Sequence, residues 1–363
     1  MHIAIILSSL GAGGAERVLA LLASHWTAIG RRVTIIAFDR PTDAVFHDFG
    51  PLVRLVRLDL PSGGNGAAGL LGRRVRRLRQ VLRDEAPDVI ISFLFKINVT
   101  TLMAGLGLGI PVVVSERNNP VRQQAHPLWP LLRTWLYPRA AALVLQTEQS
   151  RHALSRRQAR AGVVIANPIS RWPRNPEPGP GVRKVLAAVG RLDDQKGFDL
   201  LVPAFARIAA QVPGWDLVIW GEGPRRADLE AQVAELGMKD RISLPGLSLA
   251  PGGWIDSASA FVLSSRFEGF GNAMAEAMAA GLPVVAFGCD YGVAVLAVPG
   301  VDCLVVPPED VAALAVAIRT LLVDRDLRER LGRKAAVSAR RFAAPAIFAQ
   351  WDGLIDAALR PQP

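Results

Sequence analysis

Short, continuous apolar runs recur along this chain, separated by segments whose apolar positions repeat every three to four residues. Continuous apolar runs are typical of parallel strands covered on both faces, and the segments between them are typical of amphipathic helices. The alternation predicts doubly wound α/β sheets. Strands are expected at 3–8, 33–38, 53–58, 89–93, 112–115 and 142–146, and then at 185–190, 216–220, 242–244, 260–263, 284–287 and 304–306.

A proline-rich segment interrupts this rhythm at 167–182, N-P-I-S-R-W-P-R-N-P-E-P-G-P-G-V. Proline and glycine at this density are typical of a linker between domains. The sequence therefore predicts two Rossmann-like domains, an N-terminal one at 1–166 and a C-terminal one at 183–344. Ligands of such sheets bind beyond the carboxyl ends of the strands, so a cleft where two such domains face each other is the expected site. A last amphipathic helix is expected at 345–360.

Composition and charge narrow the class of protein. The chain has 363 residues, of which 50% are hydrophobic and 20% charged, which excludes a disordered or collagen-like protein. Its net charge of +10 favours anionic partners, namely phosphorylated ligands, acidic lipid surfaces or nucleic acid. The two cysteines imply no disulfide framework and fit a reduced cytosolic setting. No apolar run reaches the ~18 residues of a membrane-spanning helix, and the N-terminal run reads as a first strand.

The densest group of candidate binding residues lies at 264–281, S-S-R-F-E-G-F-G-N-A-M-A-E-A-M-A-A-G. Glu268 lies on a loop broken by glycines, and Glu276 lies eight positions later among strong helix formers. Gly269 and Gly271 allow the backbone to turn sharply beside a ligand, and the first N–H groups of the helix suit a phosphate. A loop carboxylate, a helix N-terminus and a helix carboxylate would together hold a nucleotide sugar.

Further candidate loops follow other predicted strands. In G-R-L-D-D-Q-K-G at 190–197, Arg191 and Lys196 could clamp a diphosphate and neutralise it as a leaving group. Residues 221–224, G-E-G-P, form a tight turn. In the first half, the loop G-A-G-G-A-E follows the first strand and permits close approach of a ligand. A dinucleotide-binding turn is the alternative, because Asp39 ends the second strand where a ribose-binding acid would be, although the spacing is not G-x-G-x-x-G.

Together these segments resemble retaining glycosyltransferases of family 4, which have the GT-B fold. Segment 264–281 resembles the E-x7-E motif, 190–197 the G-R-x-x-x-x-K-G motif, 221–224 the G-x-G-P turn, and G-G-A-E-R the first glycine loop. The resemblance implies two Rossmann-like domains, acceptor binding by the first and nucleotide-sugar binding by the second, with the helix at 345–360 packed on the first.

The resemblance also implies roles for individual residues. Catalytic roles fall on Arg191, Lys196 and Glu268. Donor contacts are expected at Gly13, Gly14, Gly190, Gly221, Glu222, Gly223, Phe270, Gly271, Asn272 and Glu276. A front-face attack is expected, in which the departing diphosphate receives the acceptor's proton and no protein nucleophile is needed. The chain has no D-x-D element near these motifs, so no metal is expected, and no cofactor besides the nucleotide-sugar substrate.

Two segments depart from the family pattern. Many relatives carry a histidine near the segment S-E-R-N-N-P, where Glu116, Arg117 and Asn118 are the candidates for acceptor or donor-sugar contacts. Glu116 and Arg117 could equally form a structural ion pair, and nearby His126 is expected to be merely exposed. The segment resembles members that extend lipid-linked oligosaccharides or exopolysaccharides. The stretch Gly292–Val295 lacks the acid that relatives commonly have, which predicts an altered donor-sugar specificity or a drifted loop.

Six arginines lie within eleven residues beside an apolar helical stripe. They are Arg73, Arg74, Arg76, Arg77, Arg79 and Arg83. The alternatives are a solvated basic face, capture of an acceptor's phosphates, or adhesion to an anionic bilayer, with Arg73, Arg76 and Arg77 as candidate membrane contacts. No aromatic platform accompanies the charges, so no nucleic-acid partner is expected.

The expected function is transfer of a hexosyl or N-acetylhexosaminyl group from a UDP-sugar to a hydroxyl of a glycan acceptor. The acceptor is expected to be a polyprenyl-diphosphate-linked glycan in cell-surface polysaccharide or lipopolysaccharide synthesis. The protein would then be cytoplasmic and peripherally associated with the inner face of the cell membrane. A GT-B nucleotide-sugar epimerase, an NAD-dependent oxidoreductase and a non-catalytic glycan-binding module remain as alternatives.

Overall fold

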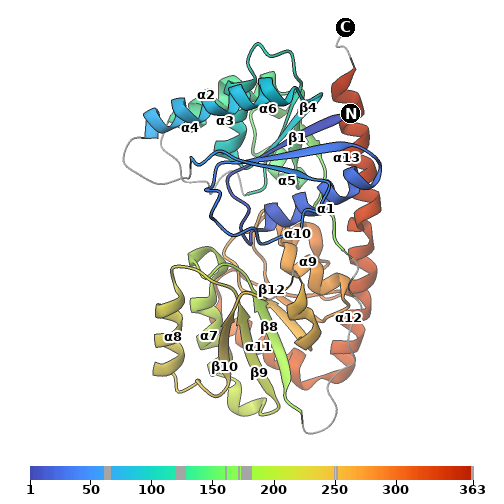
Figure 1. Ribbon diagram of the computed structural model, residues 1–363. Coiled ribbons are helices and arrows are strands. Elements are labelled where there is room, and N and C mark those ends of the chain that lie inside the picture. Colours follow the sequence, from blue (N-terminus) through green and yellow to red (C-terminus); the bar gives the residue numbers. More distant parts are fainter. Residues whose placement is uncertain are drawn as a thin grey trace. The chain divides into compact units, whose positions relative to one another are not determined.

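The computed structural model describes residues 1–60, 67–118, 128–159, 162–170, 172, 182–248, 250 and 252–360. The chain divides into two compact units, which we treat separately (Figure 1). Unit 1 comprises Met1–Pro168 together with Ala344–Pro363, and unit 2 comprises Ile169–Ala343. Most of the predicted linker at 167–182 lies outside the described residues.

Unit 1 contains a seven-stranded parallel sheet with the order β3-β2-β1-β4-β5-β6-β7. Its strands are β1 (His2–Leu7), β2 (Arg32–Ala37), β3 (Arg54–Arg57), β4 (Val89–Phe93), β5 (Val112–Ser115), β6 (Ala142–Leu145) and β7 (Gly162–Val164). The apolar runs predicted all of these strands except β7. That edge strand has three residues, none of them fully buried, and the short apolar run V-V-I-A at 163–166 was not interpreted as a strand.

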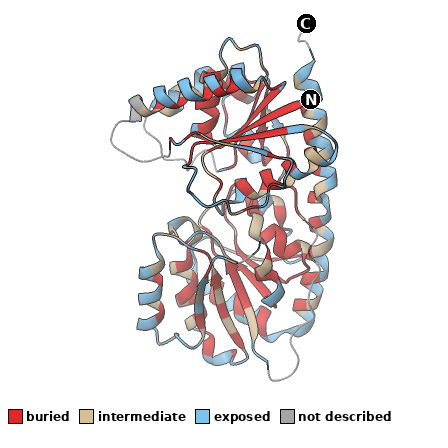
Figure 2. Ribbon diagram, in the orientation of Figure 1, coloured by how far each residue is buried: buried red, intermediate tan, exposed pale blue. Residues whose placement is uncertain are grey.

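Helices cover both faces of this sheet because the side chains of a strand alternate between them. Ile3, Ile5 and Leu7 of β1 belong to the core under α1 (Gly14–Ala28) and α13 (Ala344–Leu359). Ala4 and Ile6 belong to the opposite core, which lies under three other helices. These are α2 (Ala67–Glu85), α3 (Phe95–Gly105) and α4 (Leu128–Leu136); the shorter helices are η1 (Tyr137–Arg139), α5 (Glu148–His152) and α6 (Arg156–Ala159). The central strands are buried, whereas the edge strands β3 and β7 and the outer faces of the helices are more exposed (Figure 2).

Unit 2 contains a six-stranded parallel sheet with the order β10-β9-β8-β11-β12-β13. The strands are β8 (Lys184–Val189), β9 (Trp215–Trp220), β10 (Ile242–Gly246), β11 (Ala260–Leu263), β12 (Val284–Phe287) and β13 (Leu304–Val306). The longer helices are α7 (Phe198–Ala206), α8 (Arg226–Glu235), α9 (Asn272–Ala279), α11 (Val311–Val323) and α12 (Arg325–Ala339). Short ones are η2 (Asp194–Lys196), η3 (Ala209–Gln211), η4 (Gly253–Ser257), α10 (Gly292–Leu296) and η5 (Arg340–Phe342).

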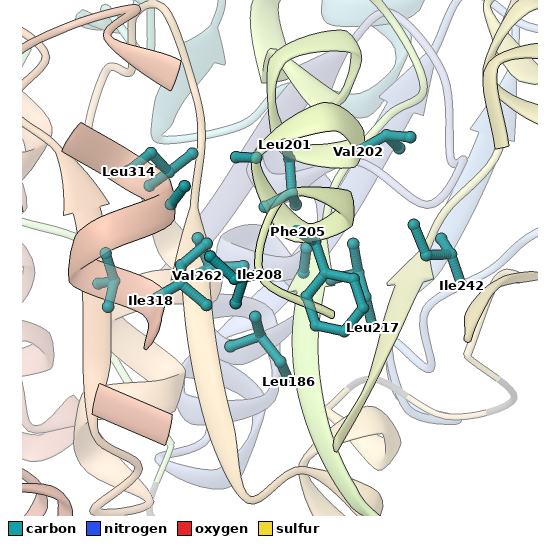
Figure 3. Packing of buried hydrophobic residues seen from close by; sticks show 14 of the residues in the cluster. Leu186, Leu201, Val202, Phe205, Ile208, Leu217, Ile242, Val262, Leu314 and Ile318 are labelled. Atoms are coloured by element: carbon teal, nitrogen blue, oxygen red, sulfur yellow. The ribbon is translucent and has the colours of Figure 1, made fainter. Parts of the chain in front are cut away.

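The core of unit 2 packs strands against α7 and α11 (Figure 3). Leu186, Leu217 and Val262 of three neighbouring strands are covered by Leu201, Phe205, Leu314 and Ile318. This packing fixes β8 and β11 side by side in the middle of the sheet. The chain order reverses between these two strands, and at such a switch point the loops after the strands diverge and leave a crevice for a ligand.

Candidate functional site

Two motif loops of unit 2 follow β8 and β11, the strands at the switch point, and hydrogen bonds tie them together. The Gln195 side-chain amide donates to the Phe267 carbonyl at 3.0 Å, and the Arg266 backbone N–H donates to the Gln195 carbonyl at 2.8 Å. The Ser264 hydroxyl donates to the Lys196 carbonyl at 2.8 Å. The fold therefore joins the G-R-x-x-x-x-K-G loop to the first half of the E-x7-E segment.

A short ion pair lies where these loops meet. Lys196 Nζ is 2.6 Å from Glu268 Oε1, and the Ser265 hydroxyl donates to the same oxygen at 2.7 Å. Glu268 is only 6% exposed, so little water competes for its carboxylate. The structure thus brings together two of the predicted catalytic residues and adds Ser265 as a second donor.

Arg266 was not among the candidate residues predicted from the sequence, yet its side chain binds the loop and helix on either side of Lys196. Its guanidinium contacts both carboxylate oxygens of Asp199 at 2.9 and 2.7 Å and the Asp194 carbonyl at 2.7 Å, and it pairs with Glu309 at 3.1 Å. The hydrogen bonds from Arg266 lower the pKa of Asp199. The only signal in the sequence was an arginine two positions before Glu268, which is not distinctive by itself.

Arg191 lies at the surface of the same loop. Its Nε is 2.5 Å from Asp193 Oδ2, and its side chain is largely exposed. Asp193 also accepts a hydrogen bond from the Lys196 backbone N–H at 3.3 Å, at the start of η2. The same carboxylate therefore orients Arg191 and caps the turn that carries Lys196.

The glycine-rich turn after β9 packs directly on the Arg191 loop. Gly221 has φ 150°, and a Cβ there would lie 1.8 Å from the Gly190 carbonyl oxygen. A Cβ on Gly223 would lie 2.4 Å from the Leu192 carbonyl oxygen. Steric fit between the loops thus requires both glycines before any ligand is considered.

Glu222, between those glycines, is exposed and engaged by a neighbour. Its carboxylate accepts hydrogen bonds from Arg226 Nη2 at 2.7 Å and Nε at 2.8 Å. These hydrogen bonds lower the pKa of Glu222. A donor contact by Glu222 would have to share this carboxylate with Arg226.

Helix α9 begins directly after Gly271, which has φ 89°. Phe270 is buried, and its ring meets the edge of Phe342 with a centroid distance of 5.2 Å. Asn272 is the first residue of the helix, and Glu276 is buried one turn further on. The side chain of Phe270 therefore belongs to the core, which fixes the backbone on which the predicted phosphate amides lie.

The segment Gly292–Val295, which departs from the expected family pattern, lies in α10 and packs on the same segment. A Cβ on Gly292 would lie 2.5 Å from the Phe270 carbonyl oxygen and 3.1 Å from Glu268 Cβ. The preceding residue, Tyr291, forms an isolated parallel bridge with Glu268 and has φ 71°. Contact between backbones thus accounts for a glycine at this position.

The first glycine loop lies after β1 in unit 1. Gly13 is the N-cap of α1, and a Cβ on it would lie 2.0 Å from Glu16 Oε2, so the buried Glu16 carboxylate covers Gly13. Gly14 is the first residue of the helix. His47 Nε2 lies 3.2 Å from the Gly13 carbonyl oxygen, and burial lowers the pKa of His47.

Asp39, the acid of the dinucleotide alternative, already has partners. Its Oδ1 lies 2.6 Å from Arg57 Nε, and its Oδ2 accepts the Leu10 backbone N–H at 2.9 Å. A ribose-binding acid would need to offer its oxygens to hydroxyl groups. These contacts give Asp39 a structural role, which weighs against the dinucleotide alternative.

The segment after β5 points inward at Glu116 and Arg117. Glu116 is buried and accepts a hydrogen bond from the Tyr137 hydroxyl. Arg117 is buried 4.3 Å from the Phe93 ring centroid and 5.5 Å from that of Trp351, and it donates to Asn167. Burial lowers the pKa of Arg117 to about 9. Asn118 is exposed, whereas residues 119–127, including His126, lie outside the described residues.

The arginine-rich segment forms α2, and its arginines have different environments. Arg73, Arg76, Arg77 and Arg83 are exposed. The expectation that all six form a basic face is wrong for two of them. Arg74 is buried and donates to the Leu60 carbonyl at 2.9 and 2.6 Å, and Arg79 donates to the Ala104 carbonyl at 2.9 Å and to the Leu106 carbonyl at 2.5 Å. These two arginines satisfy backbone carbonyls of adjoining segments.

Comparison with known protein families identifies the class of this protein. The family model "Glycosyl transferase 4-like domain" matches residues 13–170, and the model "Glycosyl transferases group 1" matches residues 183–324. The chain belongs to glycosyltransferase family 4, and its two parallel-sheet α/β domains form the GT-B fold. The predicted family and fold class are confirmed.

Individual relatives have names from exopolysaccharide or lipid-linked glycan synthesis. The chain is 30% identical over 279 residues to an exopolysaccharide phosphotransferase of Streptomyces coelicolor, covering 76% of this chain and 29% of that protein. It is 26% identical over 359 residues to the Campylobacter jejuni GalNAc-alpha-(1->4)-GalNAc-alpha-(1->3)-diNAcBac-PP-undecaprenol alpha-1,4-N-acetyl-D-galactosaminyltransferase, covering 98% of each. The chain spans only 29%, 54% and 45% of the length of the first three curated relatives that it matches.

Solved structures share the fold at low sequence identity. Sucrose-phosphate synthase of Thermosynechococcus elongatus has a TM-score of 0.82 at 22% identity, covering 97% of this chain and 98% of that one. Anabaena HepE, solved with UDP and glucose, has a TM-score of 0.79 at 21% identity, covering 98% and 99%. No helix among the described residues is long and apolar enough to cross a bilayer.

Proposed function

We propose that this chain is a retaining glycosyltransferase that moves a sugar from a UDP-sugar to a hydroxyl of a glycan acceptor. The observation that carries the proposal is the Lys196–Glu268 pair, at 2.6 Å, at the carboxyl ends of β8 and β11. A cation for a diphosphate and a fixed carboxylate for sugar hydroxyls meet there, beside the N-terminus of α9. Family membership supports the same activity.

Unit 2 would hold the donor. Glu276 on α9 would accept hydrogen bonds from the ribose, and the amides of Phe270, Gly271 and Asn272 would meet the diphosphate. Glu268 would contact hydroxyls of the donor sugar. UDP is proposed as the nucleotide because the HepE structure contains UDP and glucose, and that protein shares the fold.

Lys196 and Arg191 would stabilise the departing diphosphate. A lysine ammonium has three donors, so Lys196 can hold Glu268 and a phosphate oxygen at the same time. Arg191 is exposed, and the residue that the structure shows holding it is Asp193, in a surface ion pair, so a diphosphate can compete for its guanidinium. Fixed cations facing the developing charge lower the barrier without rearranging during the reaction. The acceptor's proton would pass to the leaving diphosphate.

The acceptor is proposed to be a polyprenyl-diphosphate-linked glycan in polysaccharide or lipopolysaccharide synthesis. The relative from Campylobacter jejuni acts on an undecaprenyl-diphosphate-linked glycan by its name, and it aligns over 98% of both chains. Such an acceptor would require the enzyme to work at a membrane surface, where the exposed Arg73, Arg76 and Arg77 could contact anionic headgroups. A hexosyl or an N-acetylhexosaminyl group is proposed as the transferred sugar, with no resident metal or cofactor.

The test begins with a thermal-shift screen of nucleotides and nucleotide sugars on the full chain. The best-bound donor is then incubated with lipid-linked acceptors, and the product's anomeric configuration is determined by NMR. Lys196→Ala and Glu276→Ala should lower turnover by about 100-fold or more while the protein remains folded, whereas Arg319→Gln, at an exposed position of α11, should change neither turnover nor folding. Near-normal turnover of either site variant would overturn the site assignment.

Other activities give distinct outcomes in the same experiment. A nucleotide-sugar epimerase would change the free donor without any acceptor. An NAD-dependent enzyme would be stabilised by NAD and not by UDP. A non-catalytic glycan-binding module would be stabilised by glycans without consuming a donor. Any of these results would replace the proposed transfer.

A further inference from the structure

Helix α4 of unit 1 is apolar on its outer face as well as on its inner one. Trp129 and Leu132 pack against the core that α2 and α3 cover, and Leu136 is buried in it. On the opposite side, Leu131 is 55% exposed and Trp135 is 57% exposed. A helix that covers a sheet normally presents polar residues to water. The sequence of α4, L-W-P-L-L-R-T-W-L, offers only Arg133 and Thr134 as polar residues.

The one charged residue of α4 does not shield this face. The Arg133 guanidinium lies 5.0 Å from the Phe95 ring centroid, on α3. Exposed Lys96 of α3 likewise lies over the ring of Trp129, at 5.8 Å. Trp135 and Leu131 are four residues apart and therefore adjacent on the helix surface. Adjacent exposed apolar side chains of this size are typical of an interaction surface.

Helix α2 adds positive charge on the same side of the sheet. Leu78 and Leu82 of α2 belong to the same core as Leu132 of α4, so both helices lie on one face of the sheet, with α3 in contact with each (Figure 1). The outer sides of α2 and α4 therefore face away from the same face of the sheet. The arginines on the outer side of α2 are Arg73, Arg76, Arg77 and Arg83.

Acidic residues hardly offset this charge. The three helices together contain only Asp84 and Glu85, both at the C-terminal end of α2. Glu85 is paired with Arg32 at 3.2 Å and with Arg54 at 2.9 Å. The layer therefore presents aromatic and aliphatic side chains on α4 beside clustered cations on α2.

An anionic bilayer matches this combination. At a lipid surface, tryptophan and leucine enter the boundary between headgroups and acyl chains, while arginines contact lipid phosphates. A second copy of this chain is a poor occupant, because two basic α2 faces would repel each other. If the outer face of α4 remained in contact with water, its exposed Leu131 and Trp135 would have no explanation.

We propose that unit 1 docks on an anionic membrane through α4 and α2, with Trp135 and Leu131 inserted into the lipid interface. Arg73, Arg76 and Arg77 would supply the attraction to headgroups. The proposal deepens the proposed function by naming the surface that would bring the enzyme to a lipid-linked acceptor. The insertion of apolar side chains of α4 into the lipid is the new element. Because this contribution to binding is not electrostatic, it should persist at high salt.

The test is flotation of the purified full chain with vesicles of phosphatidylcholine alone and of phosphatidylcholine containing one-third phosphatidylglycerol, each at low and high salt. The wild type should float with the anionic vesicles and partly keep this binding at high salt. The double variant Leu131→Ser, Trp135→Ser should lose about tenfold or more in binding. The double variant Arg76→Gln, Arg77→Gln should lose about fivefold for each arginine removed, at low salt only.

Matched controls are exposed residues of α11 and α12 in unit 2. Val316→Ser with Val337→Ser removes two exposed apolar side chains, 63% and 56% exposed. Arg319→Gln with Arg330→Gln removes two exposed cations. Neither control should alter flotation, and melting temperatures must show that all variants are folded. Flotation of the Leu131, Trp135 variant equal to wild type, or dimers in gel filtration that this variant abolishes, would overturn the proposal.

The donor assay separates this proposal from the proposed function. The α4 variant should keep the UDP-sugar thermal shift of wild type and its turnover on a detergent-soluble acceptor. Loss of vesicle binding with intact transfer supports docking by α4. Vesicle binding by wild type without any transfer activity would leave docking standing and remove the proposed function.

Discussion

Lys196 and Glu268, separated by 72 residues in the sequence, approach within 2.6 Å through Nζ and Oε1. The approach depends on three other links between their loops, from Gln195, Arg266 and Ser264. The ion pair is therefore not an isolated surface contact but the end of a hydrogen-bonded seam between the loops after β8 and β11.

The two members of the pair should respond differently to neutral replacement. Lys196→Met removes the cation proposed to stabilise the leaving group, so kcat should fall by about 10²–10³ with little change in donor affinity. Glu268→Gln keeps a hydrogen-bond acceptor for Lys196 and Ser265. Its kcat should therefore fall less than that of Lys196→Met, and its KM for the donor should rise. Steady-state kinetics with the best-bound nucleotide sugar measure both. Equal effects of the two variants on KM alone would show that neither acts on the departing group.

Gly221 should tolerate no side chain. Gly221→Ala places a Cβ 1.8 Å from the Gly190 carbonyl oxygen, at φ 150°, so the turn must shift. We expect a loss of about 2 kcal/mol or more in the free energy of unfolding, measured by urea denaturation. Gly214→Ala is the control, because nothing lies within 4 Å of a Cβ there, and it should stay within about 1 kcal/mol of wild type. Comparable losses in both variants would contradict the steric explanation.

Arg117 should be replaceable by an apolar side chain of similar length. Among the described residues, its Nε and Nη2 are buried without a hydrogen-bond partner, beside the stacked rings of Phe93 and Trp351. A buried base with a lowered pKa binds its proton less tightly than the unfolded chain does, and this cost is present at every pH below about 9. Arg117→Met should therefore leave the free energy of unfolding unchanged or raise it.

Arg117→Ala separates charge from packing. It removes the same charge but leaves a cavity beside Trp351, so it should cost about 2–4 kcal/mol. Chemical denaturation of both variants gives the comparison. A large loss of stability in Arg117→Met would mean that the guanidinium itself, through Asn167, holds this part of unit 1.

Acid should destabilise unit 1 through its buried histidines. Burial lowers the pKa values of His2 and His47 from 6.5, so the unfolded chain binds protons that the folded chain does not. The unfolding free energy should therefore fall as the pH drops below about 6.5, through the lowered pKa values. His47→Gln should reduce this fall, measured as the difference in melting temperature between about pH 7 and about pH 5. An unchanged pH dependence would exclude His47 as a contributor.

Much of the fold could be predicted from the apolar pattern. Buried parallel strands need continuous apolar runs, and such runs predicted every strand except β7, a three-residue edge strand whose run at 163–166 is too short to be distinctive. The motif residues Lys196, Glu268 and Glu276 were predicted as a group, because glycine turns and helix starts have local signatures. Arg266 could not be predicted, because its partner Asp199 lies 67 residues away and only folding brings them together.

For some residues, the structure shows a different role from the one predicted from the sequence. Gly190, Gly221 and Gly223 were predicted as donor contacts, and the structure shows that backbone packing requires at least the last two. Arg74 and Arg79 were expected to belong to one basic face, whether solvated or ligand-binding, but they bind backbone carbonyl oxygens. Helical periodicity shows which face a residue occupies, yet it does not show which carbonyl groups of other segments lie opposite that face.

The sequence alone determined the two α/β domains, the family and the positions of the candidate loops, because burial and turn formation depend on residues close together in the chain. The tertiary structure decided which charges meet. It paired Lys196 with Glu268, buried Arg117 beside two stacked aromatic rings, and left Leu131 and Trp135 exposed. These outcomes depend on which segments the sheets place side by side, and no local pattern contains that information.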